Sequence, residues 1–68
     1  MDHINIETFL DDTRQKLGSR LREARIAREY SLEDLAIATG LTEAEISAIE
    51  DGTSTNTHHV ERIEHALC

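Results

Sequence analysis

Residues 31–52, SLEDLAIATGLTEAEISAIEDG, carry the signals for two short helices joined by a tight turn. Ser31 precedes an apolar run, and Asp34 follows it by three residues, the spacing at which a hydroxyl and a carboxylate cap a helix start reciprocally. After the run, Gly40 can adopt the positive φ that a residue just past a helix end requires. The first helix is therefore predicted to lie between these two signals.

The second helix is predicted from a repeat of the same pattern. Thr42 and Glu45 form another capping pair, Ile46 and Ile49 fall on one face, and Gly52 marks the end. Two capped helices around a glycine turn, with apolar residues at this spacing, predict a helix-turn-helix.

The composition of the chain favours helices outside this stretch as well. The chain has 68 residues, no proline and three glycines, and it shows no alternation of apolar and polar residues typical of strands. This length is that of one small domain. We therefore predict an all-α fold, a compact bundle of four or five helices with the helix-turn-helix at its centre.

Cysteine usage and hydropathy bear on the compartment. A single cysteine cannot form an internal disulfide, which suits a reducing environment. No apolar run is long enough for a signal peptide or a membrane span. The expectation is a cytoplasmic protein without a membrane association.

Residues 1–16 are predicted to form an N-terminal helical arm, and residues 17–68 the helix-turn-helix domain. The arm helix is expected from about Asn5 to Lys16, and Gly18 permits it to continue into the next helix. Its sizeable apolar residues are Ile6, Phe9 and Leu10. These side chains either cover the core of their own chain or form a surface for homodimerisation.

Four segments, LGSRLREAR, SLEDLA, TGLT and ISAIEDG, give the chain a resemblance to a known family. They resemble the phage-repressor and Cro-like helix-turn-helix domains of bacteria and phages, the xenobiotic-response-element family. The resemblance covers about residues 17–67. It implies a small transcriptional regulator, for example a repressor, that binds double-stranded operator DNA as a homodimer, with the helix that starts at Thr42 in the major groove.

The resemblance also implies which residues would contact DNA. The first turn and the outward face of the second motif helix would meet base edges, and these positions are Thr42, Glu43, Ala44, Ser47 and Ala48. Arg20 and Arg22 would supply attraction to phosphates at the edge of the interface. Hydroxyl groups of the following loop, at Thr53 and Ser54, would donate to the DNA backbone.

The resemblance also implies a structural role for three further positions. Arg25 matches the family arginine that pairs with a glutamate of the second motif helix, here Glu50. A guanidinium can donate to both oxygens of a carboxylate, which would tie the two helices together. Glu29 stands where the family usually has glycine, so this turn is expected to be strained or rerouted.

The charge of the chain argues against a simple DNA-binding surface. There are 14 acidic and 7 basic side chains, a formal net charge of −7, and no Lys or Arg lies between Ser31 and Val60. A competing interpretation is an adapter or antirepressor that binds another protein through an acidic surface. The residues that would form this surface are Leu32, Ile37, Glu43 and Glu45.

We expect neither catalysis nor a cofactor. The sequence contains no nucleophile beside a suitable base and no glycine-rich phosphate loop, and so small a bundle is not expected to hold a substrate pocket. His58, Glu61, His65 and Cys68 are metal-ligand types along the last helix. However, the two histidines lie two helical turns apart, about 10 Å, which is too far for one ion.

Overall fold

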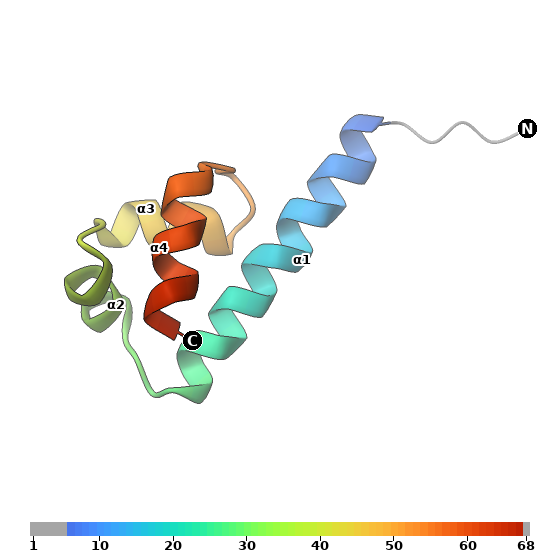
Figure 1. The fold of residues 1–68 in the computed structure, drawn as a ribbon. Coiled ribbons are helices and arrows are strands. Elements are labelled where there is room, and N and C mark those ends of the chain that lie inside the picture. Colours follow the sequence, from blue (N-terminus) through green and yellow to red (C-terminus); the bar gives the residue numbers. More distant parts are fainter. Residues whose placement is uncertain (1–5, 68) are drawn as a thin grey trace, which may run out of the picture.

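The computed structural model describes residues 6–67, with side chains from Thr13 onward, and these residues form four helices and no strand (Figure 1). The predicted all-α bundle is confirmed. The helices are α1 (Ile6–Ala27), α2 (Leu32–Thr39), α3 (Glu43–Glu50) and α4 (Thr57–Leu67). Although α1 is long, no helix in this part of the chain has an apolar stretch that could cross a membrane.

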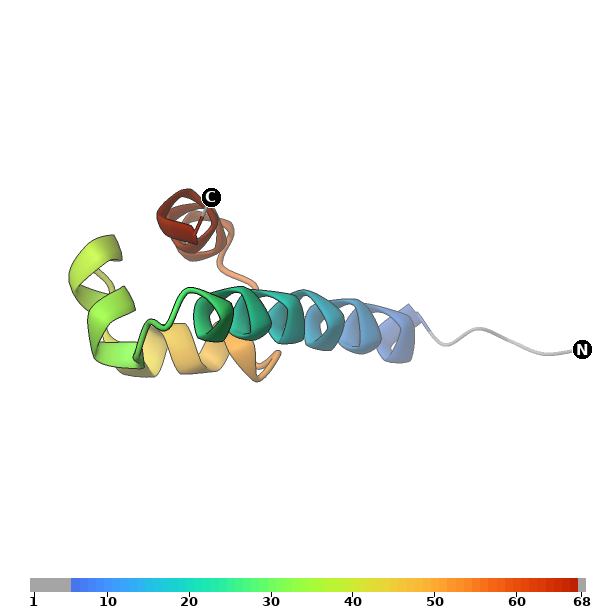
Figure 2. The same ribbon diagram turned by 90° about the horizontal axis from the view of Figure 1, so that it is seen from below.

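The longest helix, α1, packs against α3 and α4, and α2 packs against α3 and α4 on the far side from α1 (Figure 1). Figure 2 shows α1 between α4 on one side and α3 on the other, while the N-terminal half of α1 extends beyond both. The sequence suggested an arm helix that ends at about Lys16 and a second helix that follows it and contains Gly18. They are one uninterrupted helix, the continuation that Gly18 permits. The arm side chains Ile6, Phe9 and Leu10 lie outside the described side chains.

Gly18 is required for a reason that the sequence did not reveal. It is buried where the C-terminal end of α3 meets α1. A Cβ atom at this position would lie 2.4 Å from the carbonyl oxygen of Glu50 and 2.5 Å from that of Ile49. Since real Cβ contacts are longer than this, only glycine allows α1 and α3 to approach so closely.

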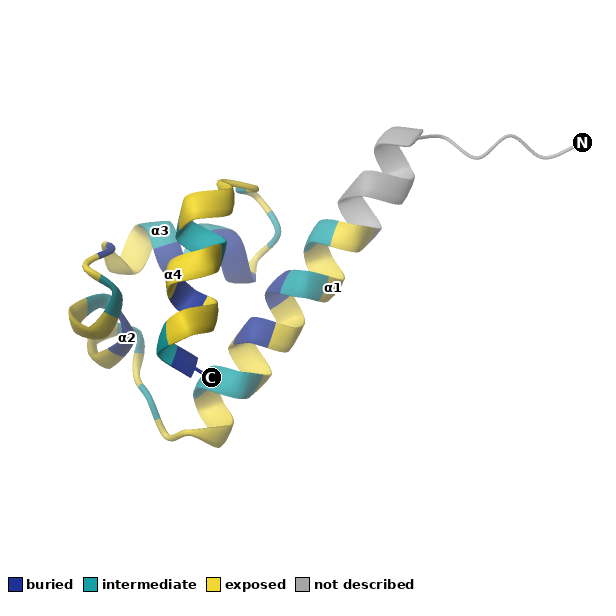
Figure 3. Ribbon diagram, in the orientation of Figure 1, coloured by how far each residue is buried: buried dark blue, intermediate teal, exposed yellow. Residues whose placement is uncertain are grey.

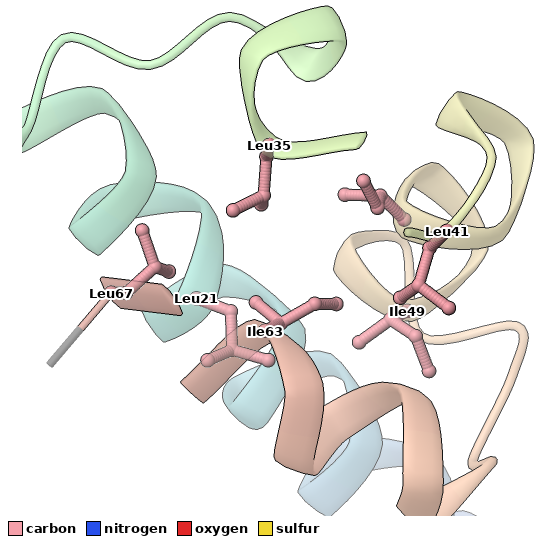
Figure 4. Packing of buried hydrophobic residues seen from close by; sticks show 7 residues of the cluster. Leu21, Leu35, Leu41, Ile49, Ile63 and Leu67 are labelled. Atoms are coloured by element: carbon pink, nitrogen blue, oxygen red, sulfur yellow. The ribbon is translucent and has the colours of Figure 1, made fainter. Parts of the chain in front are cut away.

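The hydrophobic core lies where the four helices meet (Figures 3 and 4). Its buried members are Leu21, Leu35, Leu41, Ile46, Ile49, Ile63 and Leu67. Leu35, Ile46 and Ile63 are completely inaccessible to solvent. Leu41, in the turn between α2 and α3, is also buried and closes the corner of the motif. Every helix contributes at least one side chain to this core.

Both predicted capping boxes are present. Ser31 Oγ accepts from the Asp34 amide at 2.9 Å, and Asp34 Oδ2 accepts from the Ser31 amide at 3.0 Å. At the start of α3, Thr42 Oγ1 accepts from the Glu45 amide at 3.0 Å, and Glu45 Oε1 accepts from the Thr42 amide at 2.9 Å. These amide donors lower the pKa of the Asp34 carboxyl and of the Glu45 carboxyl, because they favour the ionised form.

The turn between α2 and α3 is held by a glycine and a hydroxyl. Gly40 has a φ of 76°, and its amide donates to the Ala36 carbonyl at 2.9 Å. Thr39 Oγ1 donates to the Leu35 carbonyl at 2.7 Å and accepts from the Leu41 amide at 3.2 Å. The backbone of the turn is therefore fixed before α3 begins.

The end of α1 has the hydrogen bonds of a Schellman motif, but with glutamate at the glycine position. The Glu29 amide donates to the Ile26 carbonyl at 2.9 Å, and the Tyr30 amide donates to the Arg25 carbonyl at 3.0 Å. Glu29 is exposed and has a φ of 60°, the left-handed region that side chains with a Cβ rarely adopt. Of the two alternatives for this turn, strain is thus the one observed.

Replacing Glu29 by glycine is expected to stabilise the domain. The substitution Glu29→Gly relieves the left-handed strain and should raise the free energy of unfolding by about 0.5–1 kcal/mol, measured by urea denaturation. The matched control is Glu29→Ala, which removes the carboxylate but keeps the Cβ, and should give no comparable gain. Equal stabilities of the glycine and alanine variants would show that the turn is not strained.

Candidate nucleic-acid interface

Helix α3 presents the predicted recognition positions on its accessible side. Its inner side is anchored by Ile46, Ile49 and Glu50, which are buried. The predicted DNA-contacting positions are exposed at Thr42, Glu43 and Ala44 and half-buried at Ser47 and Ala48. The capping box and the glycine at Gly52, with a φ of 78°, set the two ends of this helix. A partner approaching α3 would meet all five of the predicted positions on this side.

The loop after α3 folds back onto the end of that helix. The amides of Thr53 and Ser54 donate to the Ala48 carbonyl at 2.9 and 3.1 Å, and Thr53 Oγ1 donates to the same carbonyl at 3.1 Å. The hydroxyl proton of Thr53 is therefore already bonded to a carbonyl of the domain. Ser54 Oγ accepts from the Asn56 amide at 3.3 Å, which leaves the Ser54 hydroxyl proton for another acceptor.

Glu50 is a buried carboxylate held by Arg25. Only 4% of Glu50 is exposed, and it accepts two bonds from Arg25, from Nε to Oε2 at 2.7 Å and from Nη2 to Oε1 at 3.1 Å. Arg25 Nη1 also donates to the Tyr30 carbonyl at 2.8 Å. This is the ion pair that the resemblance implied, and it fixes the C-terminal end of α3 against α1.

Arg22 makes a second set of contacts to α3 that sequence reasoning did not assign. Its Nε donates to Glu50 Oε1 at 3.2 Å, and its Nη2 donates to Asp51 Oδ1. These two carboxylates raise the pKa of Arg22. The available signal was the spacing of Arg22 and Arg25, three residues apart and so on one side of the helix. The guanidinium expected at a DNA phosphate is held by carboxylates of its own chain.

Arg20 lies on the other side of α1. Gly18, Arg22 and Arg25 mark the side of α1 that faces α3. The helical period of 3.6 residues places Lys16 and Arg20 on the opposite side. There they line a shallow surface hollow with other residues of α1, and no residue of α3 contributes to it. The structure does not bring Arg20 together with the recognition positions.

The motif built from these parts has a counterpart among known protein families. A family model described as a helix-turn-helix domain matches residues 16–67. The chain belongs to this helix-turn-helix domain family. Its α2 and α3 are the two helices of the motif, and the family supports a DNA-binding regulator in general. No curated protein and no solved structure matches the chain.

The recognition helix of this helix-turn-helix domain is acidic, and α4 lies beside its first turn, whereas the arginines of α1 hold its last residue. His59 Nε2 lies 3.5 Å from Glu45 Oε2. The pKa of the Glu45 carboxyl is lowered chiefly because the carboxylate accepts a hydrogen bond from the Thr42 amide. Electrostatic attraction to His59 and Arg62 lowers it further. Glu45 is thus engaged in capping and in contact with α4, whereas Glu43 is exposed.

The residues of the alternative, protein-binding surface are only partly together at the surface. Ile37 is 76% exposed on α2. Leu32 is half-buried and packs against the core of the helix-turn-helix domain. A second exposed isoleucine that sequence reasoning did not single out is Ile26 on α1, at 58%. Within the described residues no cluster of three or more His, Cys, Asp or Glu side chains could hold a metal ion.

Loss of either partner of the buried pair is expected to destabilise the domain strongly. Glu50→Ala leaves the largely buried Arg25 guanidinium without a carboxylate, which should lower the free energy of unfolding by about 3–5 kcal/mol. Arg25→Ala leaves the buried Glu50 carboxylate with Arg22 alone, so its loss should be smaller but still exceed that of an exposed pair. The control is Asp51→Asn, which removes only the exposed contact of Arg22 and should cost about 0–1 kcal/mol. Urea denaturation at low temperature measures all three. Losses for the first two variants no larger than that of the control would contradict a structural role for the pair.

Proposed function

We propose that this protein is a small cytoplasmic transcriptional regulator that binds operator DNA as a homodimer, with α3 in the major groove. The observation that carries the proposal is the presentation of α3 by the helix-turn-helix. Its inner residues and Glu50 are buried, its ends are fixed by the capping box and Gly52, and its outer side is accessible. In this motif the second helix is the one that meets base edges.

The accessible side chains of α3 could discriminate between bases despite their charge. The Glu43 carboxylate can accept a hydrogen bond from the amino group of cytosine, and the Ser47 hydroxyl can bond to either a base or a phosphate. Ala44 and Ala48 are suited to contact with a thymine methyl group. Such contacts provide sequence preference, whereas they contribute little non-specific attraction.

Phosphate attraction would come from few groups in each protomer. Arg22 and Arg25 are engaged with carboxylates, and Arg20 lies on the side of α1 away from α3. The Ser54 hydroxyl and the amides of Glu43 and Ala44, which the capping box does not use, remain as donors. Two protomers on a two-fold symmetric operator would double these contacts, with half-sites about one helical turn apart.

A second candidate function follows from the charge of the same surface. The segment from Ser31 to Val60 has no Lys or Arg, Glu43 is exposed, and Ile37 is 76% exposed on the neighbouring helix α2. An acidic surface beside an exposed isoleucine suits a basic and apolar patch on another protein. In this alternative the domain would act as an adapter or antirepressor.

Selection from a random DNA pool, followed by binding of variants, tests the proposal. The double substitution Glu43→Ala/Ser47→Ala should abolish the preference for the selected sequence. The expected loss of binding free energy is about 1–3 kcal/mol for each base pair that these side chains read. The double variant should have equal or higher non-specific affinity, because one carboxylate is removed. The matched control is Glu61→Ala, which removes an exposed carboxylate on α4 and should preserve the preference.

Two results would contradict the proposal. An unchanged sequence preference of the double variant would exclude α3 as the element that recognises bases. Absence of any selected DNA, together with loss of a protein partner in the double variant, would favour the adapter.

A further inference from the structure

Asp51 directly follows α3, and its carboxylate has one partner among the described residues. That partner is the Arg22 guanidinium, whose Nη2 donates to Asp51 Oδ1. Both side chains lie at the surface, with 56% of Asp51 and 45% of Arg22 exposed. An exposed ion pair of this kind contributes little to the stability of a fold. The domain therefore does not need Asp51 to hold its helices together.

Arg22 is anchored to α3 independently of Asp51. Its Nε donates to Glu50 Oε1 at 3.2 Å, on the inner side of the guanidinium. Glu50 also accepts two bonds from Arg25, so the buried carboxylate does not require the outer nitrogens of Arg22. Within the described part of the chain, those outer nitrogens, Nη1 and Nη2, have Asp51 as their only partner. Without the Asp51 carboxylate, Arg22 would stay in place with the tip of its guanidinium available.

The tip of Arg22 lies at the end of α3 where the predicted DNA-contacting loop begins. Gly52, with a φ of 78°, turns the chain directly after Asp51. The amides of Thr53 and Ser54 then bond back to the last turn of α3, and the Ser54 hydroxyl keeps a proton for another acceptor. A guanidinium and a hydroxyl at one end of a helix are groups that bind phosphate oxygens. Here, however, a carboxylate occupies the guanidinium.

We propose that Arg22 is a phosphate-binding residue that Asp51 masks, so that Asp51 limits the affinity of the domain for polyanions. The Asp51 carboxylate takes the place of a phosphate oxygen at the tip of the guanidinium, while Glu50 keeps Arg22 oriented from the inner side. The inference rests on the proposed function for its partner, the phosphate backbone of nucleic acid. It assigns Asp51 a role in restraining binding rather than in folding.

Unmasking Arg22 has a measurable consequence. Each phosphate contact of a basic side chain adds about 0.9 to the magnitude of the slope of log K against log[salt] on duplex DNA. An available Arg22 should therefore steepen this slope by about 0.9 for each protomer bound. Because the slope acts over the tenfold interval between 1 M and 0.1 M salt, the same contact should raise the affinity at 0.1 M salt by about eightfold for each protomer.

A double-mutant cycle of Arg22 and Asp51, measured on mixed-sequence duplex DNA, tests the inference. Asp51→Ala removes the mask and should produce the steeper slope. The same substitution in an Arg22→Gln chain should leave the slope unchanged, because no guanidinium is released. The matched control is Glu61→Ala, which removes an exposed carboxylate on α4 and should also leave the slope unchanged. Circular dichroism verifies that the variants fold, which the remaining pair of Arg25 and Glu50 should ensure.

Two results on DNA would overturn the inference. One is an unchanged slope for Asp51→Ala, and the other is an equal increase in the Arg22→Gln chain, which would mean that Asp51 acts only by general repulsion. Selection of a DNA sequence through α3 without any gain from Asp51→Ala would overturn this inference and leave the proposed function intact.

Retention on heparin, a sulfated polyanion without bases, separates the inference from the proposed function. Asp51→Ala should elute from heparin at higher salt than the intact chain, and the shift should disappear in the Arg22→Gln chain. This result in a protein that selects no DNA sequence would support the masked arginine and overturn the proposed function alone. An elution salt that does not change with Asp51→Ala would contradict the masked arginine.

Discussion

The carboxylate of Glu50, buried between the guanidinium groups of Arg22 and Arg25, is the interaction on which this domain depends. It lies at the last residue of α3 and brings that end of the helix against α1. The approach is close enough that Gly18 has no room for a Cβ atom. The close contact of Gly18 with the backbone of α3 and the ion pair of Glu50 therefore lie at the same end of α3. Together they fix the orientation of α3 relative to α1.

The same interaction determines the charge of the molecular surface. Two of the cations that precede the motif in sequence neutralise carboxylates at the end of α3, and Lys16 and Arg20 lie on the opposite side of α1. The outward side of α3 consequently keeps Glu43 without a described basic neighbour. In the proposed function, such a helix-turn-helix would rely on shape and on hydrogen bonds to bases more than on counterion release, and a second protomer would add more to its affinity than to that of a basic domain.

Features that depend on short stretches of sequence could be predicted, because their causes are local. Both capping boxes and the glycine turn at Gly40 follow from residues a few positions apart. The strain at Glu29 and the partnership of Arg25 with Glu50 were implied only by the resemblance to a family, since each requires knowing what other chains place there.

Features that depend on how helices approach each other could not be predicted in this way. The contact of Gly18 with two carbonyl oxygens and the second guanidinium on Glu50 arise only when α1 and α3 are packed together. For the same reason the sequence assigned Arg20 and Arg22 to DNA phosphates, although packing places one away from α3 and the other on two carboxylates. Charge counted along a chain does not show which side of a helix each charge will occupy.

The dependence of DNA affinity on salt measures most directly whether the cations are engaged inside the domain. For a duplex containing a selected sequence, the account predicts binding that is detectable at low salt and falls gently. The slope of log K against log[salt] should not exceed about 4 in magnitude for a dimer, since each protomer offers only about two phosphate contacts. A slope of about 8 or more would contradict the account, because it would require basic side chains at the interface that the structure places elsewhere.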